Sequence, residues 1–356
     1  MSHPSGSKPN STSNLRVLVL AGGRSSERDV SLATGAAVSR GLHDAGFHIL
    51  TFDPVVSPRA IPWSPDAGAA SIDTTPPDQS VLASNGNPMG TALTPQDLAM
   101  VDLKSVDLVF IALHGGDGEN GRLQALLDLC GVRYTGSGMM ASALAMDKHA
   151  AKRIFTAEGI PTPRWFAAEP GMIPTFDEVR ATIGLPLIIK PSCQGSTVGL
   201  SLVRDESQWD KALSDAFVWD QRVLIEEFIA GRELTVGVLG GQTMPVVEII
   251  PTHEIYDYEC KYTSGRTQYI CPADLTPEQA DEVQRLGLDA FNALGCQGYA
   301  RTDFRMSKDG RFFCLEVNTL PGMTSLSLVP KAARTAGIEF PDLLKRICQL
   351  ALEPRP

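Results

Sequence analysis

Apolar runs alternate with amphipathic stretches along the first 160 residues of the chain. Residues 15–20 (LRVLVL), 47–52 and 107–113 are short apolar runs, which are typical of strands buried on both faces. Between the first two runs, apolar side chains recur at helical spacing from Val30 to Leu42, and a second helical pattern covers residues 142–158. This order predicts an α/β unit that begins with parallel strands.

The remainder of the chain also mixes the two periodicities. Strands are predicted at residues 186–190, 198–203, 223–229, 233–239 and 244–250, with a hairpin pairing 298–306 and 311–318. Helices are predicted at 206–217 and 277–294, and two further helices close the chain. A polar, aromatic loop is predicted over residues 252–269. The pattern as a whole indicates the α/β (α+β) class.

Two segments lack such periodicity. Residues 1–14 (MSHPSGSKPNSTSN) have no apolar core segment, so we expect a disordered tail and not a secretory signal. Residues 57–98 contain seven prolines and many small polar residues, which predicts a long irregular surface insertion.

Composition narrows the class of protein further. Lys and Arg total 31 against 41 Asp and Glu, so the formal charge is −10 without a basic block, which argues against a nucleic-acid partner. No apolar run approaches the ~18 residues that a membrane helix needs. The seven cysteines include no CxxC pair and have no histidine at ligand spacing, which predicts free thiols in a reducing cytoplasm and disfavours a zinc site or thiol catalysis.

The predicted hairpin carries the clearest candidate chemistry. A two-residue type I′ turn at residues 309–310 (Asp-Gly) would place Asp303 opposite Glu316 and Arg301 opposite Asn318, all on one face. Facing carboxylates repel each other and raise each other's pKa unless a cation lies between them. Two carboxylates and an amide are an oxygen set that suits Mg²⁺. The alternative is a solvated sheet face with an ordinary Arg–carboxylate pair.

Residues 190–199 (KPSCQGSTVG) form a glycine-rich loop between two predicted strands. Gly195 and Gly199 allow close backbone approach, Ser196 adds a hydroxyl, and Lys190 supplies charge, which together suit a cover over phosphates. The loop is not a P-loop, because the GxxxxGK[ST] pattern is absent. A tight turn without a ligand is the alternative.

Further candidates follow other predicted strands. Glu27 and His114 both lie just after a buried strand, and ligands of open α/β sheets bind at the carboxyl ends of the strands. Taken singly, Glu27 could be a helix-dipole partner and His114 a structural histidine. Residues 318–327 lead from the hairpin into a predicted helix, whose free N–H groups could seat a carboxylate or phosphate.

Taken together, these motifs resemble the D-alanine–D-alanine ligase family of the ATP-grasp superfamily, from about residue 15 to residue 352. The matching stretches are GGRSSERDVSLATG (22–35), residues 114–124, YTGSGMMASALAMDK (134–148), residues 190–199, residues 223–240, YDYECKYTSGRTQYICPADL (256–275) and residues 301–330. The resemblance implies ATP-dependent ligation of two D-alanine molecules to D-alanyl-D-alanine through an acyl phosphate, for peptidoglycan precursor synthesis in the cytoplasm.

The resemblance also implies a three-part ATP-grasp fold. The parts would be an N-terminal α/β domain with a parallel sheet over residues 15–136, a central domain over 137–226 and a C-terminal domain over 227–356. ATP would be held between the latter two. The expected ligands are D-alanine, ATP and two Mg²⁺ ions, and Mn²⁺ could substitute for Mg²⁺. The expected assembly is a homodimer. Neither a nucleic acid nor a membrane is an expected partner.

Site residues carry over from the family by position. The ATP site would comprise Lys148, Lys190, Ser196, Glu226, Glu227, Phe228, Ile229, Glu233 and Lys261. The two metal ions would bind Asp303, Glu316 and Asn318. The D-alanine substrates would contact Glu27, His114, Arg301, Ser327 and the N–H of Leu328. Glu27, Ser196 and Tyr262 would form a hydrogen-bonded triad that closes the loop over 256–269, and Arg301 with the Gly322 N–H would stabilise the oxyanion.

The chain departs from the family pattern at several positions. Residues 193–194 are Cys-Gln where many members carry Arg-Glu, Thr197 replaces the usual Ser, and Asn120 replaces a common Asp. These changes concern affinity and loop dynamics, whereas the core residues are present.

Three alternatives remain open at this point. The first is a ligase that makes a D-Ala-D-lactate depsipeptide, against which Tyr262 argues because those relatives carry Phe. The second is another ATP-grasp enzyme such as a carboxylase subunit, which would lack the Glu27 and 256–269 signatures. The third is a nucleotide-binding regulatory protein without catalysis, which would be expected to lose part of the metal or oxyanion set.

Overall fold

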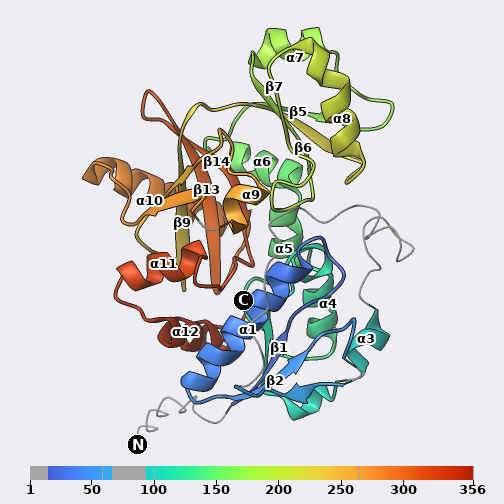
Figure 1. Ribbon diagram of the computed structural model, residues 1–356, viewed down its shortest axis with the longest axis vertical. Coiled ribbons are helices and arrows are strands. Elements are labelled where there is room, and N and C mark those ends of the chain that lie inside the picture. The colour runs from blue at the N-terminus through green and yellow to red at the C-terminus, as the bar shows by residue number, and fades with distance from the viewer. Residues whose placement is uncertain (1–14, 58, 66–93, 100, 264, 356) are drawn as a thin grey trace, which may run out of the picture.

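Three sheets organise the protein, and the computed structural model describes residues 15–57, 59–65, 94–99, 101–263 and 265–355 (Figure 1). The predicted tail at residues 1–14 lies outside the described residues, as does most of the predicted insertion at 57–98. Of that insertion, the structure describes a short strand, β3 (Ile61–Pro62), and a short helix, α3 (Pro95–Ala99).

The first sheet has the order β3-β2-β1-β4. Strands β1 (Arg16–Leu20), β2 (His48–Phe52) and β4 (Leu108–Ile111) are parallel, and β3 pairs antiparallel at the edge. All of β4 and four of the five residues of β1 are buried, as expected of continuous apolar runs. Helix α1 (Arg28–Asp44) connects β1 to β2 and α4 (Arg122–Leu129) follows β4, so the predicted parallel α/β start is confirmed.

The end of the chain packs into this same unit. Helix α12 (Phe340–Leu352) lies beside α1 in Figure 1, and its apolar residues share a hydrophobic core with the first sheet. Helix α11 (Leu328–Thr335) contributes Leu328, Val329, Ala332 and Ala333 to that core. The last two helices therefore attach the end of the chain to the N-terminal unit.

The second and third sheets are antiparallel. The second has the order β5-β8-β6-β7 with helices α7 and α8, and the third has the order β12-β11-β9-β13-β14, with β10 paired to β9 and α10 packed on β9 and β13. Their bounds are β5 (Trp165–Ala168), α7 (Phe176–Ile183), β6 (Leu187–Pro191), β7 (Ser201–Val203), α8 (Trp209–Phe217), β8 (Val223–Glu227), β9 (Gly231–Leu239), β10 (Gln242–Thr243), β11 (Val247–Pro251), β12 (Thr267–Ile270), α10 (Pro277–Ala293), β13 (Tyr299–Ser307) and β14 (Phe312–Asn318).

Some local predictions were wrong. The segment before residue 186 contains β5 and α7, neither of which was predicted, although a capping box between Thr175 and Glu178 marks the start of α7. The predicted loop over 252–269 contains helix α9 (Tyr258–Tyr262) and most of β12. Among the described residues, no helix is both long enough and apolar enough to cross a bilayer.

The helix predicted over 142–158 is in fact two helices, α5 (Met139–Met146) and α6 (Lys148–Ala157). Asp147 separates them in an extended conformation, and its carboxylate accepts hydrogen bonds from the N–H groups of His149 and Ala150. A side chain that caps a new helix in this way competes with continuation of the preceding one. The break places Lys148 at the first position of α6.

The hairpin has the predicted pairing at the site but a different turn. Asp303 faces Glu316 and Arg301 faces Asn318, so that part of the register is confirmed. At the turn, however, Ser307 donates its N–H to the carbonyl of Arg311, which makes a three-residue connection rather than the predicted two-residue turn. A register shift after Asp303 pairs Phe304 with Cys314, so Leu315 is an extra residue in β14. The bulge restores the register that the longer turn had offset.

Candidate active site

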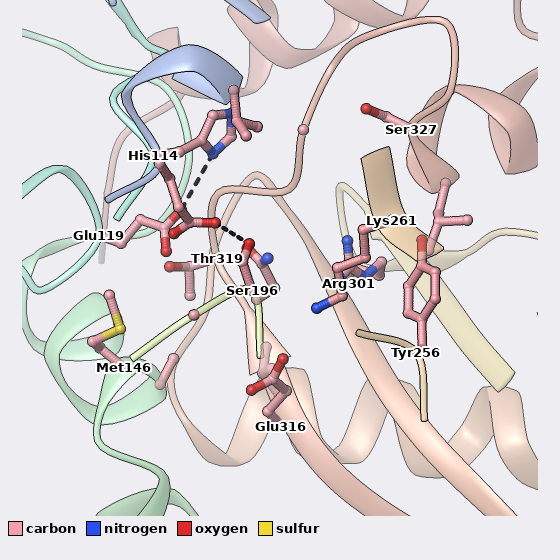
Figure 2. Close-up of a pocket in the computed structure, with 18 of the residues that line it drawn as sticks. His114, Glu119, Met146, Ser196, Tyr256, Lys261, Arg301, Glu316, Thr319 and Ser327 are labelled. Carbon is pink, nitrogen blue, oxygen red and sulfur yellow. Dashed lines mark hydrogen bonds and ion pairs between the residues drawn. The ribbon is translucent and has the colours of Figure 1, made fainter. Parts of the chain in front are cut away.

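Two neighbouring cavities collect nearly all the residues predicted for the site. The first is lined by Glu27, His114, Lys148, Ser196, Lys261, Arg301, Glu316, Asn318, Gly322, Ser327 and Leu328, among others. The second is lined by Lys148, Lys190, Ser196, Glu226, Glu227, Phe228, Ile229, Glu233, Lys261, Arg301, Asp303 and Glu316, among others. Residues such as Lys148, Ser196, Lys261, Arg301 and Glu316 line both, so the two cavities adjoin at these side chains. Figure 2 shows Ser196, Lys261, Arg301 and Glu316 in the first cavity.

Glu27 is held at one end of the first cavity. It occupies the N-cap position of α1, but its carboxylate accepts a hydrogen bond from Ser196 Oγ instead of capping the helix. A Cβ atom at Gly195 would lie 2.9 Å from Glu27 Oε2, so a side chain there would displace the carboxylate. Burial raises the pKa of Glu27, as does the nearby Glu119, and the hydrogen bond from Ser196 partly offsets this effect. The glycine at position 195 therefore allows the loop to approach Glu27 closely.

His114 is fixed on the same side of the cavity. One ring nitrogen, Nδ1, lies 3.3 Å from the Glu119 carboxylate, and Nε2 lies 2.9 Å from Thr34 Oγ1 on α1. Figure 2 shows His114 and Glu119 together, opposite Lys261 and Arg301. The two partners hold the imidazole in one orientation at the cavity wall.

The carboxylates of the hairpin are balanced by cations of the protein itself. Arg301 makes two hydrogen bonds to Asp303, both of 2.8 Å, and Thr235 Oγ1 donates a third to Asp303 Oδ1 at 2.6 Å. Glu316 lies 3.0 Å from Lys148 Nζ. Burial would raise the pKa of Glu316, but Lys148 and two further lysines lower it to about 2. Each facing carboxylate is thus paired with a cation of the protein itself, which is the condition under which the two need not raise each other's pKa.

Three lysines line the second cavity, which lies between the second and third sheets. Lys190 Nζ lies 2.7 Å from the Glu226 carboxylate, and Lys148 Nζ donates to the Gln194 carbonyl at 2.7 Å. Lys261 Nζ lies 5.3 Å from the centre of the Tyr256 ring, and burial lowers the pKa of this lysine. Several ammonium groups thus face one space, as a polyphosphate would require.

Two cationic residues of this region were not predicted from sequence. Lys152 is fully buried, with Nζ 3.1 Å from Glu226 and 2.7 Å from Thr162 Oγ1. Arg305 donates to the Ile229 carbonyl at 3.0 Å and pairs with Glu233 at 3.1 Å. The signals were present: Lys152 lies one helical turn after Lys148, and Arg305 continues the alternate positions that 301 and 303 occupy on β13.

The approach to α11 presents backbone donors to the first cavity. Ser327 occupies the N-cap position of α11 and its hydroxyl accepts the Thr324 N–H at 2.9 Å. Leu328 is the first helical residue, and such N–H groups have no partner within their own helix. A Cβ atom at Gly322 would lie 2.9 Å from Ser327 Oγ, so this turn packs too closely for a side chain. Asn318 Oδ1 accepts the Leu320 N–H at 2.9 Å.

The segment that contains α9 covers the glycine-rich loop. Thr197 Oγ1 donates to the Tyr256 carbonyl at 3.2 Å, and the Tyr256 and Tyr269 hydroxyls lie 2.8 Å apart. Ser196 and Thr197 have φ angles of +50° and +63°, a strained backbone for residues other than glycine. Tyr262 ends α9, and its side chain lies outside the described part of the structure, so the predicted contact with Glu27 and Ser196 stays a prediction.

Antiparallel sheets that enclose a lysine-lined cavity beside a carboxylate–amide cluster define the ATP-grasp class of enzymes. Comparison with known proteins specifies the family. The models described as D-ala D-ala ligase N-terminus and C-terminus match residues 16–137 and 154–349. The chain belongs to the D-alanine–D-alanine ligase family and is an enzyme of the ligase class.

Relatives and solved structures agree with this assignment. The D-alanine–D-alanine ligase of Pelotomaculum thermopropionicum is 39% identical over 95% of this chain and 97% of its own length. That of a Synechococcus strain is 40% identical over 95% of this chain and 94% of its own. The ligase of Bacillus anthracis superposes with a TM-score of 0.76 at 33% identity, covering 95% of this chain and 97% of its own. Its complex with ATP gives 0.75 at 32% identity, with the same coverage of both chains.

Proposed function

We propose that the protein joins two D-alanine molecules into D-alanyl-D-alanine with the conversion of ATP to ADP and phosphate, as a step of peptidoglycan precursor synthesis. The observation that carries this proposal is the set of residues common to both cavities. Lys148, Lys261 and Arg301 line each of them. A phosphoryl donor in one cavity and a carboxylate acceptor in the other would therefore meet beside three cations.

The nucleotide is assigned to the cavity between the second and third sheets. Glu226, Glu227, Phe228 and Ile229 form its hinge wall at the end of β8, and Arg305 fixes the Ile229 carbonyl and Glu233. Since both carboxylate oxygens of Glu226 already lie near lysines, we assign Glu226 to the positioning of Lys152 and Lys190. Those two lysines would otherwise repel each other.

The hairpin cluster fits Mg²⁺ by the chemistry of its donors. Asp303, Glu316 and Asn318 offer carboxylate and amide oxygens from neighbouring strands, and hard divalent ions prefer such oxygens. Arg301 and Lys148 now neutralise the two carboxylates, a role that bound cations would share. Mg²⁺ at these residues would neutralise charge on the phosphates; we propose two ions, with Mn²⁺ as a substitute.

The substrates are assigned to the first cavity. Glu27 would pair with the ammonium of the first D-alanine beside His114, because its carboxylate lines that end of the cavity and is already oriented by Ser196. Ser327 and the Leu328 N–H would receive the carboxylate of the second D-alanine at the start of α11. The two amino acids would then lie on either side of Arg301.

The protein's residues support each chemical stage. Lys148 and Lys261 would stabilise the γ-phosphoryl group as it moves to the first carboxylate, which becomes an acyl phosphate. The deprotonated amine of the second D-alanine would then attack the acyl carbon, and Arg301 with the Gly322 N–H would hold the developing oxyanion. Collapse of this intermediate breaks the bond from carbon to the phosphate oxygen and releases inorganic phosphate, while the new amide nitrogen loses its proton to solvent. Water would destroy the acyl phosphate, so we propose that the segment over residues 252–269, with Tyr262, closes over the site.

Coupled release of ADP and phosphate on addition of D-alanine tests this function. We expect Mg²⁺-dependent ADP release with D-alanine but not with L-alanine, together with a dipeptide product in the mass spectrum. Arg301→Lys keeps the charge but loses the planar fork, and should lower kcat by about 10²–10³-fold. Arg285→Lys on the exposed face of α10 is the matched control. ADP release that does not depend on D-alanine would contradict the proposal.

The domain division, the assembly and the location of the protein are further proposals. We keep the division into residues 15–136, 137–226 and 227–356, and we propose a homodimer, to be tested by light scattering. We also propose a cytoplasmic location, because all seven cysteines are unpaired, as in a reducing compartment.

A further inference from the structure

A second group of metal-ligating side chains lies outside the hairpin cluster. Among the residues that the structure describes, His253, Asp257 and Cys260 each bring one ligand atom to within 4.8 Å of the other two. His253 follows the end of β11, Asp257 is the N-cap of α9, and Cys260 lies in the first turn of α9. This grouping runs against the expectation from sequence that no histidine lies at ligand spacing from a cysteine. The histidine and the cysteine are seven residues apart, and only the start of a helix brings them together.

The contacts leave the three ligand atoms facing one another. Asp257 Oδ1 accepts the Cys260 N–H at 2.9 Å, and Asp257 Oδ2 lies 2.7 Å from His253 Nδ1. The Cys260 thiol lies on the inner side, where the residue is 1% exposed, 3.8 Å from Thr252 Oγ1. The His253 and Asp257 side chains are 37% and 41% exposed, so an ion could enter from solvent.

Neighbouring carboxylates do not compete for this position. Glu254 pairs with Arg204, and Glu259 pairs with Arg266 at 3.0 Å. The negative charge that remains beside His253 is that of Asp257. An ordinary i,i+4 histidine–aspartate pair at a helix start would explain that contact without a metal, but it would not require a thiol as the third neighbour.

We propose that His253, Asp257 and Cys260 bind a divalent cation of the zinc type, with water as the fourth ligand. Nitrogen, carboxylate oxygen and thiolate are the ligands that Zn²⁺ takes, whereas Mg²⁺ disfavours sulfur. Tetrahedral zinc with its usual bond lengths places ligand atoms about 3.5 Å apart, which side-chain rotation can reach from the observed spacing. On binding, the thiol gives its proton to solvent and the histidine coordinates in its neutral form.

The site would connect metal binding to the catalytic lysine beside it. Lys261 directly follows Cys260 and lines both cavities. A bound ion would join α9 to the end of β11 and so restrict Lys261. We therefore expect metal binding to change the KM for ATP. That change rests on the proposed function, whereas metal binding itself does not.

Cobalt titration of the full chain tests the site. In excess Mg²⁺, we expect one equivalent of Co²⁺ to bind and to produce the near-ultraviolet charge-transfer band of a Co²⁺–thiolate bond, which Zn²⁺ then abolishes by displacement. His253→Gln should weaken Co²⁺ binding at least about tenfold, the range typical for loss of supporting groups at metal sites. Cys260→Ala should remove the band, and Cys130→Ala, at an exposed cysteine elsewhere, should leave it unchanged.

Circular dichroism of each variant controls for folding. If Cys260→Ala does not fold, His253→Gln still tests the site, because it alters a partly exposed side chain. Absence of the band in the wild-type protein, or its persistence at equal affinity in His253→Gln, would overturn the proposal. The spectrum is independent of D-alanine turnover, so failure of the proposed function and failure of this site give different results.

Discussion

Removal of the Glu316 charge should destabilise the ligand-free protein. The Glu316 carboxylate lies 3.0 Å from Lys148, and Lys190 and Lys261 add to the positive field around it. Burial opposes ionisation, yet these lysines lower the pKa of Glu316 from 4.5 to about 2. At about 1.4 kcal/mol per pKa unit, the folded protein favours the ionised form by about 3 kcal/mol relative to the unfolded chain.

Glu316→Gln keeps the shape of the side chain and removes this charge. We expect the free energy of unfolding at pH 7 to fall by about 3 kcal/mol, because three lysines lose their shared counter-charge. Since the pKa is lowered by folding, the contribution of Glu316 is present above pH 4.5 and is lost as the pH falls towards 2. The difference between wild type and variant should therefore shrink over that interval.

Urea unfolding without ATP or divalent ions measures the difference directly. Asp289→Asn is the control, because Asp289 forms an exposed pair with Arg285 and should change stability by less than about 1 kcal/mol. Simple repulsion between facing carboxylates predicts the opposite sign, with Glu316→Gln raising the Tm. A loss below about 1 kcal/mol at pH 7, or one that persists unchanged at pH 3, would refute the charge balance described here.

Three further outcomes can be checked on the same protein. Asp303→Asn should reduce turnover at least about tenfold at saturating Mg²⁺; near-normal kcat would show that the hairpin is not the metal site. Tryptic cleavage at Lys261 and Arg266 should slow when a non-hydrolysable ATP analogue and D-alanine are added together, and unchanged cleavage would argue against a lid. Tyr262→Phe should raise the ratio of D-lactate to D-alanine product most clearly below pH 7, where the amine acceptor is protonated; equal ratios at every pH would limit Tyr262 to closure.

Local chemistry made much of the site predictable. The hairpin is the clearest example, since alternation along a strand was enough to group Arg301 with Asp303 and Glu316 with Asn318. The assumed turn was nevertheless wrong, and the pairing at the site was correct because the Leu315 bulge compensates for a three-residue connection. An Asp-Gly pair favours several turn types, and packing of both strands against their neighbours decides among them.

Helix ends were less predictable where a polar side chain can either lie within a helix or cap the start of a new one. Asp147 lies in a run of strong helix formers, and propensity alone continues the helix through it. In the structure its carboxylate caps α6 and also accepts from Ser192 Oγ on the glycine-rich loop, at 2.6 Å. That second contact comes from 45 residues away, so no local window contains it. It also fixes Lys148 where the two cavities adjoin.

The balance of charge in the site could not be predicted from the sequence. It determines which charged side chains pair with one another in the ligand-free protein. Facing carboxylates on a hairpin predict either repulsion or a metal, because only residues of that hairpin are in view. The structure supplies Lys148 from α6 and Lys261 from α9 to the same carboxylate cluster, and Lys190 and Lys152 share the carboxylate of Glu226. Substrate phosphates and divalent ions would then exchange partners with these groups and would not enter an uncompensated site. Ligand affinity should therefore depend weakly on the total charge of the cavity. It should depend strongly on which ion pair between a lysine and a carboxylate opens to receive the ligand.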